Sequence, residues 1–188
     1  MRREWLHEGK VFVLHDFLSE LDCRDQVALT EREGYTVAGL TVGPDRYVMN
    51  PEVRNNYRVI RDDPQFARQL WFRARPWVPE EIEEWRVRGL NERLRYYRYD
   101  PGQRFAPHYD GKFTRHPREH SKLTFMVYLN QDFEGGETIF YTDRNVEKLR
   151  VVPRTGMALV FLHQLLHEGA CVRQGRKYVL RTDVMYAL

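Results

Sequence analysis

The stretch YDPGQRFAPHYD at residues 99–110 decides the fold class that we expect for this chain. Its Pro101-Gly102 pair predicts a turn, and the residues that follow predict a strand ending near Asp110. Side chains alternate between the two faces of a strand, so His108 and Asp110 should point to the same side. An imidazole and a carboxylate so placed are two of the three ligands of a 2-His-1-carboxylate iron site. A His-x-Asp pair alone is a weak signal, because most such pairs are ordinary surface or core residues.

The segments around and after this stretch show the same alternation, with one apolar and one more polar face. The apolar faces are Leu123, Phe125, Val127 and Leu129 in 122–129; Tyr178, Leu180, Val184 and Tyr186 in 177–186; and Phe105, Pro107 and Tyr109 in 104–110. The opposite faces are Thr124, Met126 and Tyr128; Lys177, Arg181 and Asp183; and His108 and Asp110. This pattern allows a two-layer sheet with a wet polar face, or a jelly roll lined with polar groups and packed outside on helices.

The front half has a different pattern. Residues 11–15 predict a short strand, and Ser19 with Asp22 predicts a capped helix that ends at Gly34. Asp63-Pro64 begins a second predicted helix that runs to about Arg75, and residues 79–85 predict a third. We therefore expect an α+β fold in a single domain, 1–188. Residues 1–93 would form a helix-rich support, and residues 94–188 would form a double-stranded β-helix (jelly roll).

A third metal ligand and a cation complete the pattern. His167-Glu-Gly begins a predicted short strand, and Lys177 follows ten residues later on the next strand. A lysine directed into the same lumen would need an anionic partner, because an unpaired buried charge is costly. His163 is a rival ligand, because Arg173, ten residues after it, is also cationic. Spacing alone therefore leaves both histidines open, and the sequence around His167 and Lys177 favours His167.

Four ordered motifs resemble the prolyl 4-hydroxylase-like family of Fe(II)- and 2-oxoglutarate-dependent dioxygenases. They are YDPGQRFAPHYD (99–110), LTFMVYLN (123–130), GGETIF (135–140) and HEG (167–169) with Lys177. The resemblance covers at least residues 99–186 and extends forward to 11–23 and 51–58.

This resemblance implies a set of roles. It implies that His108, Asp110 and His167 hold Fe(II). It also implies that Lys177 and Tyr128 bind the distal carboxylate of 2-oxoglutarate, with Tyr99 nearby. Dioxygen would be the second cosubstrate, and ascorbate is a candidate reductant.

Further contacts are expected from strand parity and from the resemblance. Thr124 shares the register of Tyr128, and Arg181 that of Lys177, so either could touch cosubstrate or substrate. Arg181 could equally pair with Asp110 or Asp183. The resemblance places Arg54, Asn56 and Arg58 in a substrate-facing segment. The basic loop 111–121, which includes Arg115, is expected to cover the substrate.

The predicted reaction is hydroxylation of an amino-acid residue in a peptide or protein, with peptidyl proline first. A free amino acid, or a small-molecule or peptide natural product, is an alternative substrate. A carboxylate ligand at Asp110 argues against a halogenase, which in related enzymes keeps that position free for halide. Two rivals are a nucleic-acid demethylase and a non-catalytic metal-binding jelly-roll module.

The amino-acid composition narrows the choice among these alternatives. The formal charge is only +3, from 30 Lys and Arg against 27 Asp and Glu, and it is spread along the chain. This argues against a nucleic-acid partner. Two cysteines are too few for a disulfide framework or a thiolate metal site. Because the sequence has neither a signal-like nor a membrane-length apolar stretch, we expect a soluble, cytoplasmic protein without a membrane partner.

Overall fold

The structure is a computed structural model, and it describes residues 1–43 and 46–188. Its helices are α1 (Glu20–Glu33) and α2 (Pro64–Ala74). Its strands are β1 (Arg2–His7), β2 (Val11–His15), β3 (Thr36–Val37), β4 (Leu40–Gly43), β5 (Arg46–Val48), β6 (Tyr57–Asp62), β7 (Glu81–Ile82), β8 (Trp85–Leu90), β9 (Arg93–Tyr99), β10 (Phe105–His108), β11 (Thr114–His116), β12 (Glu119–Tyr128), β13 (Phe133–Gly135), β14 (Thr138–Tyr141), β15 (Glu147–Val151), β16 (Ala158–Leu162), β17 (His167–Gly169), β18 (Val172–Gly175) and β19 (Lys177–Ala187).

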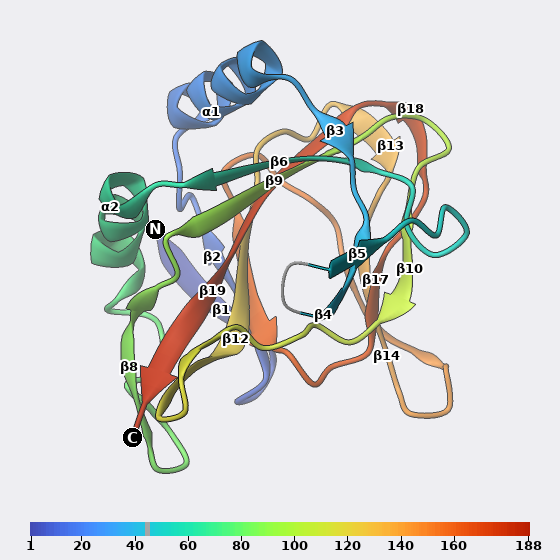
Figure 1. Ribbon diagram of the computed structural model, residues 1–188. Helices are drawn as coiled ribbons and strands as arrows, with labels where there is room; N and C mark the ends of the chain where they lie inside the picture. Colours follow the sequence, from blue (N-terminus) through green and yellow to red (C-terminus); the bar gives the residue numbers. More distant parts are fainter. Residues whose placement is uncertain (44–45) are drawn as a thin grey trace.

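Two sheets face each other (Figure 1), and a cavity lies between them. The large sheet has the order β1-β2-β16-β12-β19-β9-β6-β3, and β8 pairs with β19 beside this path. The small sheet has the order β10-β17-β14-β15. Antiparallel pairing joins the strands of both sheets, including the long partners β12 and β19. The predicted double-stranded β-helix is confirmed.

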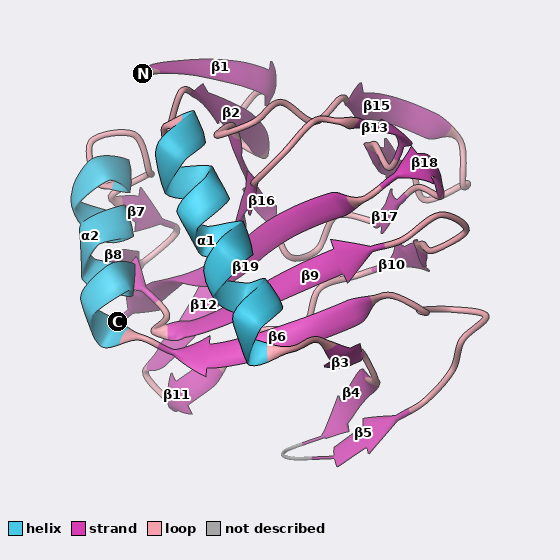
Figure 2. Ribbon diagram, turned by 90° about the horizontal axis from the view of Figure 1, so that it is seen from above, coloured by secondary structure: helices cyan, strands magenta, loops and turns pink. Residues whose placement is uncertain are grey.

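The two helices lie on the outer face of the large sheet (Figure 2). Both begin where the sequence predicted. Ser19 caps α1 in a capping box with Asp22, and Gly34 ends the helix. Asp63 caps α2, and Pro64 occupies its first turn. Helices are nevertheless a minor part of the front half, which also supplies β1, β2, β3, β6, β7 and β8 to the large sheet.

The third predicted helix, over residues 79–85, is wrong. Residues 81–90 form the hairpin β7–β8, with Glu83 at a positive φ of 55° in its turn. Ile82 and Trp85 pack against the main core, and β8 finds backbone partners on β19. Tertiary pairing along the sheet edge thus outweighs the helix propensity of the local glutamates.

Each sheet strand divides its side chains between two cores, as the alternation predicted. Phe125 and Val127 of β12 and Leu180 of β19 pack under the helices. Met126 and Tyr128, one residue out of step, belong to the inner cluster between the sheets. The inner face is therefore free to carry polar groups at one end of the lumen.

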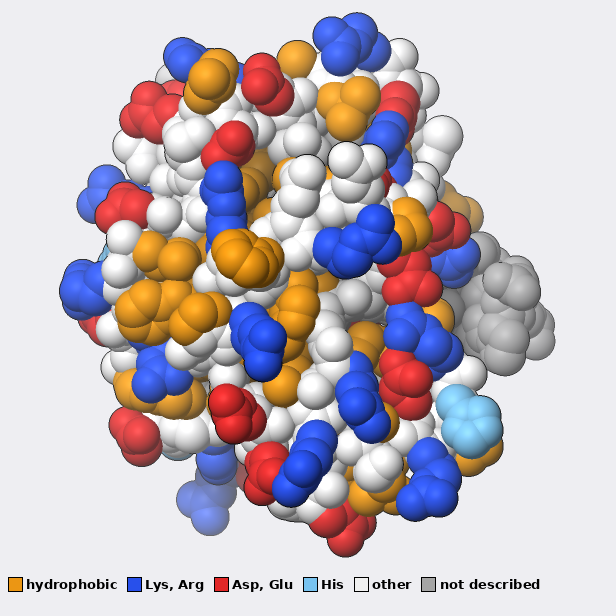
Figure 3. All heavy atoms as spheres, turned by 90° about the vertical axis from the view of Figure 1, so that its left-hand side faces the viewer, with side chains coloured by type: hydrophobic (Ala, Val, Ile, Leu, Met, Phe, Trp, Pro, Cys, Tyr) orange, Lys and Arg blue, Asp and Glu red, His pale blue; other side chains and the backbone are white. Residues whose placement is uncertain are grey.

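The surface gives no sign of a stripe of one charge on the face shown in Figure 3, where basic and acidic side chains alternate with apolar ones. Among the residues that the structure describes, no helix is long and apolar enough to cross a membrane.

Candidate functional site

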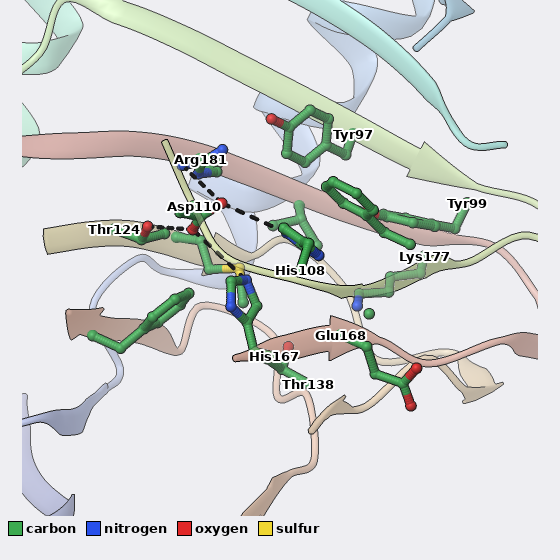
Figure 4. A pocket seen from close by; sticks show the side chains of 15 residues that line it. Tyr97, Tyr99, His108, Asp110, Thr124, Thr138, His167, Glu168, Lys177 and Arg181 are labelled. Atoms are coloured by element: carbon green, nitrogen blue, oxygen red, sulfur yellow. Dashed lines mark hydrogen bonds and ion pairs between the residues drawn. The ribbon is translucent and has the colours of Figure 1, made fainter. Parts of the chain in front are cut away.

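The lumen opens into one cavity of about 420 Å³, counting its mouth, between the large and small sheets. Its lining is Tyr97, Tyr99, Phe105, His108, Asp110, Thr124, Met126, Thr138, Phe161, His167, Glu168, Gly169, Lys177, Val179 and Arg181. Of the candidates from the sequence, the structure thus brings His108, Asp110, His167, Lys177, Tyr99, Thr124 and Arg181 to one space (Figure 4).

His108, Asp110 and His167 converge on one point of the cavity wall. Strands β10 and β17 pair so that His108 lies opposite His167. Asp110 follows the end of β10. Each residue offers a ligand atom within 4.8 Å of the others, and within the described ranges 1–43 and 46–188 this is the one such cluster. The histidine Nε2 atoms each lie 3.6 Å from an Asp110 oxygen.

Backbone carbonyls set the tautomer of both histidines. His108 Nδ1 donates to the Ala106 carbonyl (2.8 Å), and His167 Nδ1 donates to the Leu165 carbonyl (2.9 Å). Each Nε2 therefore presents its lone pair to the cavity, as a metal ligand must. Burial lowers the pKa of His167 to about 4, so this imidazole is neutral at pH 7. The donor set, two imidazoles and a carboxylate, fits Fe(II).

The Asp110 carboxylate is held from both sides. Thr124 Oγ1 donates to Oδ2, and Arg181 Nη2 lies 3.1 Å from Oδ1. Burial would raise the pKa of Asp110, but the Arg181 guanidinium holds it well below its usual range. Asp110 is therefore ionised and oriented before any metal binds.

His163 takes a supporting place behind Asp110. Its Nδ1 lies 3.0 Å from Thr124 Oγ1, whose proton is given to Asp110, so His163 donates here. Its Nε2 then accepts from Ser121 Oγ (2.8 Å). His163 is absent from the ligand cluster. The geometry thus separates the two histidines that spacing left open and favours His167 as the ligand.

Lys177 lies at the other end of the cavity, almost completely buried. Its Nζ donates to the Gly136 carbonyl (2.6 Å) and lies 5.1 Å and 5.5 Å from the ring centres of Tyr99 and Tyr128. Burial lowers the pKa of Lys177 to about 7, although nearby Glu137 acts in the opposite direction. A buried amine with so little compensation is what a cavity built for an anion would contain.

Tyr128 lies next to this amine. It is fully buried, and its hydroxyl shares a hydrogen bond with Thr138 Oγ1 (2.7 Å). Burial raises the pKa of Tyr99 to about 12 and raises that of Tyr128 still further, so both phenols stay protonated and can donate. Their roles toward a cosubstrate stay predictions.

Arg181 contacts both of its proposed structural partners, Asp110 and Asp183. The three residues that were expected to form one substrate-facing segment, Arg54, Asn56 and Arg58, lie in different places. Arg54 is buried against the rings of Tyr97 and Phe105, with Nε donating to Asn56 Oδ1 (2.7 Å). Both Arg54 and Asn56 lie behind the cavity lining.

Two other substrate candidates lie outside the cavity lining. Arg58 is half-buried on β6, opposite Tyr97 of β9. Arg115 forms ion pairs with Glu92 and Glu119 at the β11–β12 hairpin. The structure does not bring Arg115 to the cavity.

The sequence reasoning missed several cavity residues, including Tyr97, Thr138, Phe161, Glu168 and Val179, and it misplaced Phe105. Phe105 was expected on the face opposite His108, but a register irregularity between them turns it inward. Its ring stacks on the His108 imidazole at 3.5 Å between centres. Tyr97 was not singled out, although it shares strand parity with Tyr99, which could have identified it.

Comparisons with known proteins agree with this geometry. Residues 94–182 match the 2OG-Fe(II) oxygenase superfamily. Probable prolyl 4-hydroxylase 3 of Arabidopsis thaliana is 25% identical over 202 residues, which cover 91% of this chain and 67% of that protein.

Solved structures show the same fold. The viral collagen prolyl hydroxylase of Paramecium bursaria Chlorella virus-1, in its 2-oxoglutarate complex, has a TM-score of 0.68 at 21% identity, covering 98% of this chain and 100% of that one. A Trichoplax adhaerens prolyl hydroxylase, in complex with a peptide fragment of hypoxia inducible factor, has a TM-score of 0.71 at 16% identity, covering 94% and 84%.

Thr124→Val should weaken Fe(II) binding by about tenfold to a hundredfold, because Asp110 loses the donor that orients it. Thr182→Val is a matched control, since Thr182 is also fully buried but donates to the Asn91 carbonyl. Anaerobic Fe(II) titration measures the effect. Equal affinities for the wild type and Thr124→Val would show that this hydrogen bond does not orient a ligand.

Lys177→Met should stabilise the protein while removing 2-oxoglutarate binding. It replaces a buried amine whose pKa is about 7, so we expect the melting temperature to rise by roughly 5 °C. Lys122→Met, at a lysine paired with Glu83, should bring no such gain.

The same lysine predicts the pH dependence of binding. Above pH 7 the free protein holds a neutral Lys177, which must take up a proton to pair with a carboxylate. Wild-type affinity for 2-oxoglutarate should therefore fall as pH rises from 7 to 9. Affinity independent of pH over this range would remove Lys177 as the anion partner.

Proposed function

We propose that this chain, an Fe(II)- and 2-oxoglutarate-dependent dioxygenase that resembles the prolyl 4-hydroxylases, hydroxylates a proline residue of a peptide or protein. One observation carries the proposal most directly. A facial set of two imidazoles and a carboxylate lies in the same cavity as a buried lysine that has no carboxylate within ion-pair distance among the described residues.

In this proposal, His108, Asp110 and His167 hold Fe(II). Lys177 binds the distal carboxylate of 2-oxoglutarate, with Tyr128 and Tyr99 as neighbouring donors. Bound Fe(II) and 2-oxoglutarate would supply the activation of O2, which converts 2-oxoglutarate to succinate and carbon dioxide and adds one oxygen atom to the substrate.

The remaining residues prepare the site for this chemistry. Thr124 and Arg181 keep the Asp110 carboxylate ionised and fixed in direction. Phe105 and Phe161 contact the imidazole rings of His108 and His167, which limits ring rotation and keeps water from the ligand face. A site held in place in advance avoids reorganisation during the reaction.

A peptide substrate is supported by the names of similar proteins and by the open end of the lumen. Tyr109 is exposed beside Asp110. The same proposal includes ascorbate as a reductant and a cytoplasmic location.

The two rivals fit less well. A metal-binding module without a cosubstrate would have no use for Lys177, whose burial costs stability. A nucleic-acid demethylase would need a basic groove with stacking aromatic rings, whereas the chain has a formal net charge of only +3, spread along its sequence.

Incubation with Fe(II), 2-oxoglutarate, O2 and proline-containing peptides should yield succinate and peptides heavier by one oxygen atom, located on proline by fragmentation. His108→Ala should abolish both products. Succinate release coupled to oxygen on another residue would keep the dioxygenase and reject proline as its target.

A further inference from the structure

We propose that the cavity contains a second anion site, formed by Tyr97 and Arg181, which receives a carboxylate of the substrate. This inference rests on the proposed hydroxylase function and specifies its substrate. The substrate would carry a carboxylate close to the carbon that is hydroxylated, as a free amino acid, a carboxyl-terminal residue or an acidic neighbour does.

The site lies apart from the lysine end of the cavity. Lys177 and Arg181 project from the same face of β19, four residues apart, which separates their Cα atoms by about 13 Å. Figure 4 shows Lys177 beside Tyr99, and Arg181 beside Asp110 and Tyr97. A cosubstrate whose distal carboxylate pairs with Lys177 would therefore leave the Tyr97–Arg181 wall to another ligand.

Positive charge exceeds negative charge on this wall. Arg54, Arg95 and Arg181 are largely buried in or behind it. Asp183 pairs with both Arg95 (3.0 Å) and Arg181 (3.3 Å). Asp183 thus serves two guanidinium groups, whereas Arg54 donates to the neutral amide of Asn56. A buried excess of this kind favours a ligand that brings negative charge.

Hydrogen-bond donors also exceed acceptors. Within the described residues, the buried Arg54 Nη2 and Arg181 Nε meet no acceptor in good hydrogen-bond geometry, and the group that interacts with both arginines is the Tyr97 phenol. Native structures leave few buried polar atoms unpaired, and each such atom calls for a cause. Guanidinium groups only donate, so the missing partner must be an acceptor.

The excess of positive charge changes the pKa of Tyr97. Burial opposes ionisation of its phenol, yet Arg54, Arg181 and Arg95 together lower the pKa of Tyr97 to about 8. Tyr97 and Arg181 both line the cavity, whereas Arg54 stacks behind the Tyr97 ring at 4.5 Å. Tyr97 and Arg181 would therefore contact the carboxylate. Arg54 would position Tyr97 and add positive electrostatic potential.

The test uses binding without turnover, with Mn(II) and saturating 2-oxoglutarate on the full chain. Calorimetry would compare N-acetyl-L-proline with N-acetyl-L-prolinamide, which differ only in the carboxylate. We expect the acid to bind at least tenfold more tightly, the amount that a charge-assisted hydrogen bond contributes. Tyr97→Phe and Arg54→Met should each reduce this preference to roughly threefold or less.

Arg98→Met is the matched control. Arg98 is a half-buried arginine stacked on two rings, Tyr35 and Tyr57, as Arg54 is on Tyr97 and Phe105, but it lies on the helix side of β9, where it pairs with Glu31. It should keep the full preference for the acid. Equal binding of acid and amide to the wild type, or an unchanged preference in both wall variants, would overturn the proposal.

Two further measurements distinguish the substrate carboxylate site from the cosubstrate site and from the choice of proline. If raising the 2-oxoglutarate concentration displaces the acid, the site belongs to the cosubstrate and the proposal fails. N-acetyl-L-leucine and its amide test the choice of proline separately. Acid preference in the leucine pair without binding of the proline pair would support the carboxylate site and reject proline as the target. Failure of both acids to bind at millimolar concentration would reject the site.

Discussion

The buried carboxylate of Asp110 is the group on which the rest of the site depends. An ionised carboxylate inside a protein is costly unless it is paired and hydrogen-bonded. Here Thr124 and Arg181 hold its two oxygens, and the His163 imidazole supports Thr124 in turn. Both neighbouring histidines have their Nδ1 atoms committed to backbone carbonyls. These hydrogen bonds direct the three ligand atoms toward one point.

The opposite end of the cavity depends on a group that is less well compensated. The Lys177 amine donates to one backbone carbonyl and lies near two aromatic rings, and burial lowers its pKa to about 7. Such a residue lowers stability in the free protein, and binding of an anion would recover that free energy. The jelly roll makes this arrangement possible because β19 presents Lys177 and Arg181 inward while Tyr178 and Leu180 pack outward under the helices.

Much of this arrangement could be predicted from the sequence, because strand parity and capping are local properties. The alternation in residues 122–129 and 177–186 correctly separated the inner from the outer faces, and Ser19 and Asp63 correctly began two helices. Properties set by distant partners were not predictable in this way. The hairpin at β7–β8 forms because β19 offers it an edge, and the irregularity in β10 that turns Phe105 inward has no local signature. The choice between His163 and His167 likewise needed the pairing of β10 with β17.

The most direct test of the account is anaerobic addition of Fe(II) and then 2-oxoglutarate to the metal-free protein, followed by visible absorption spectroscopy. The account predicts that a charge-transfer band of the iron chelate appears in the wild type and is absent in Asp110→Ala. Iron that binds tightly to the wild type without producing this band would contradict the account and favour a metal-binding module in its place.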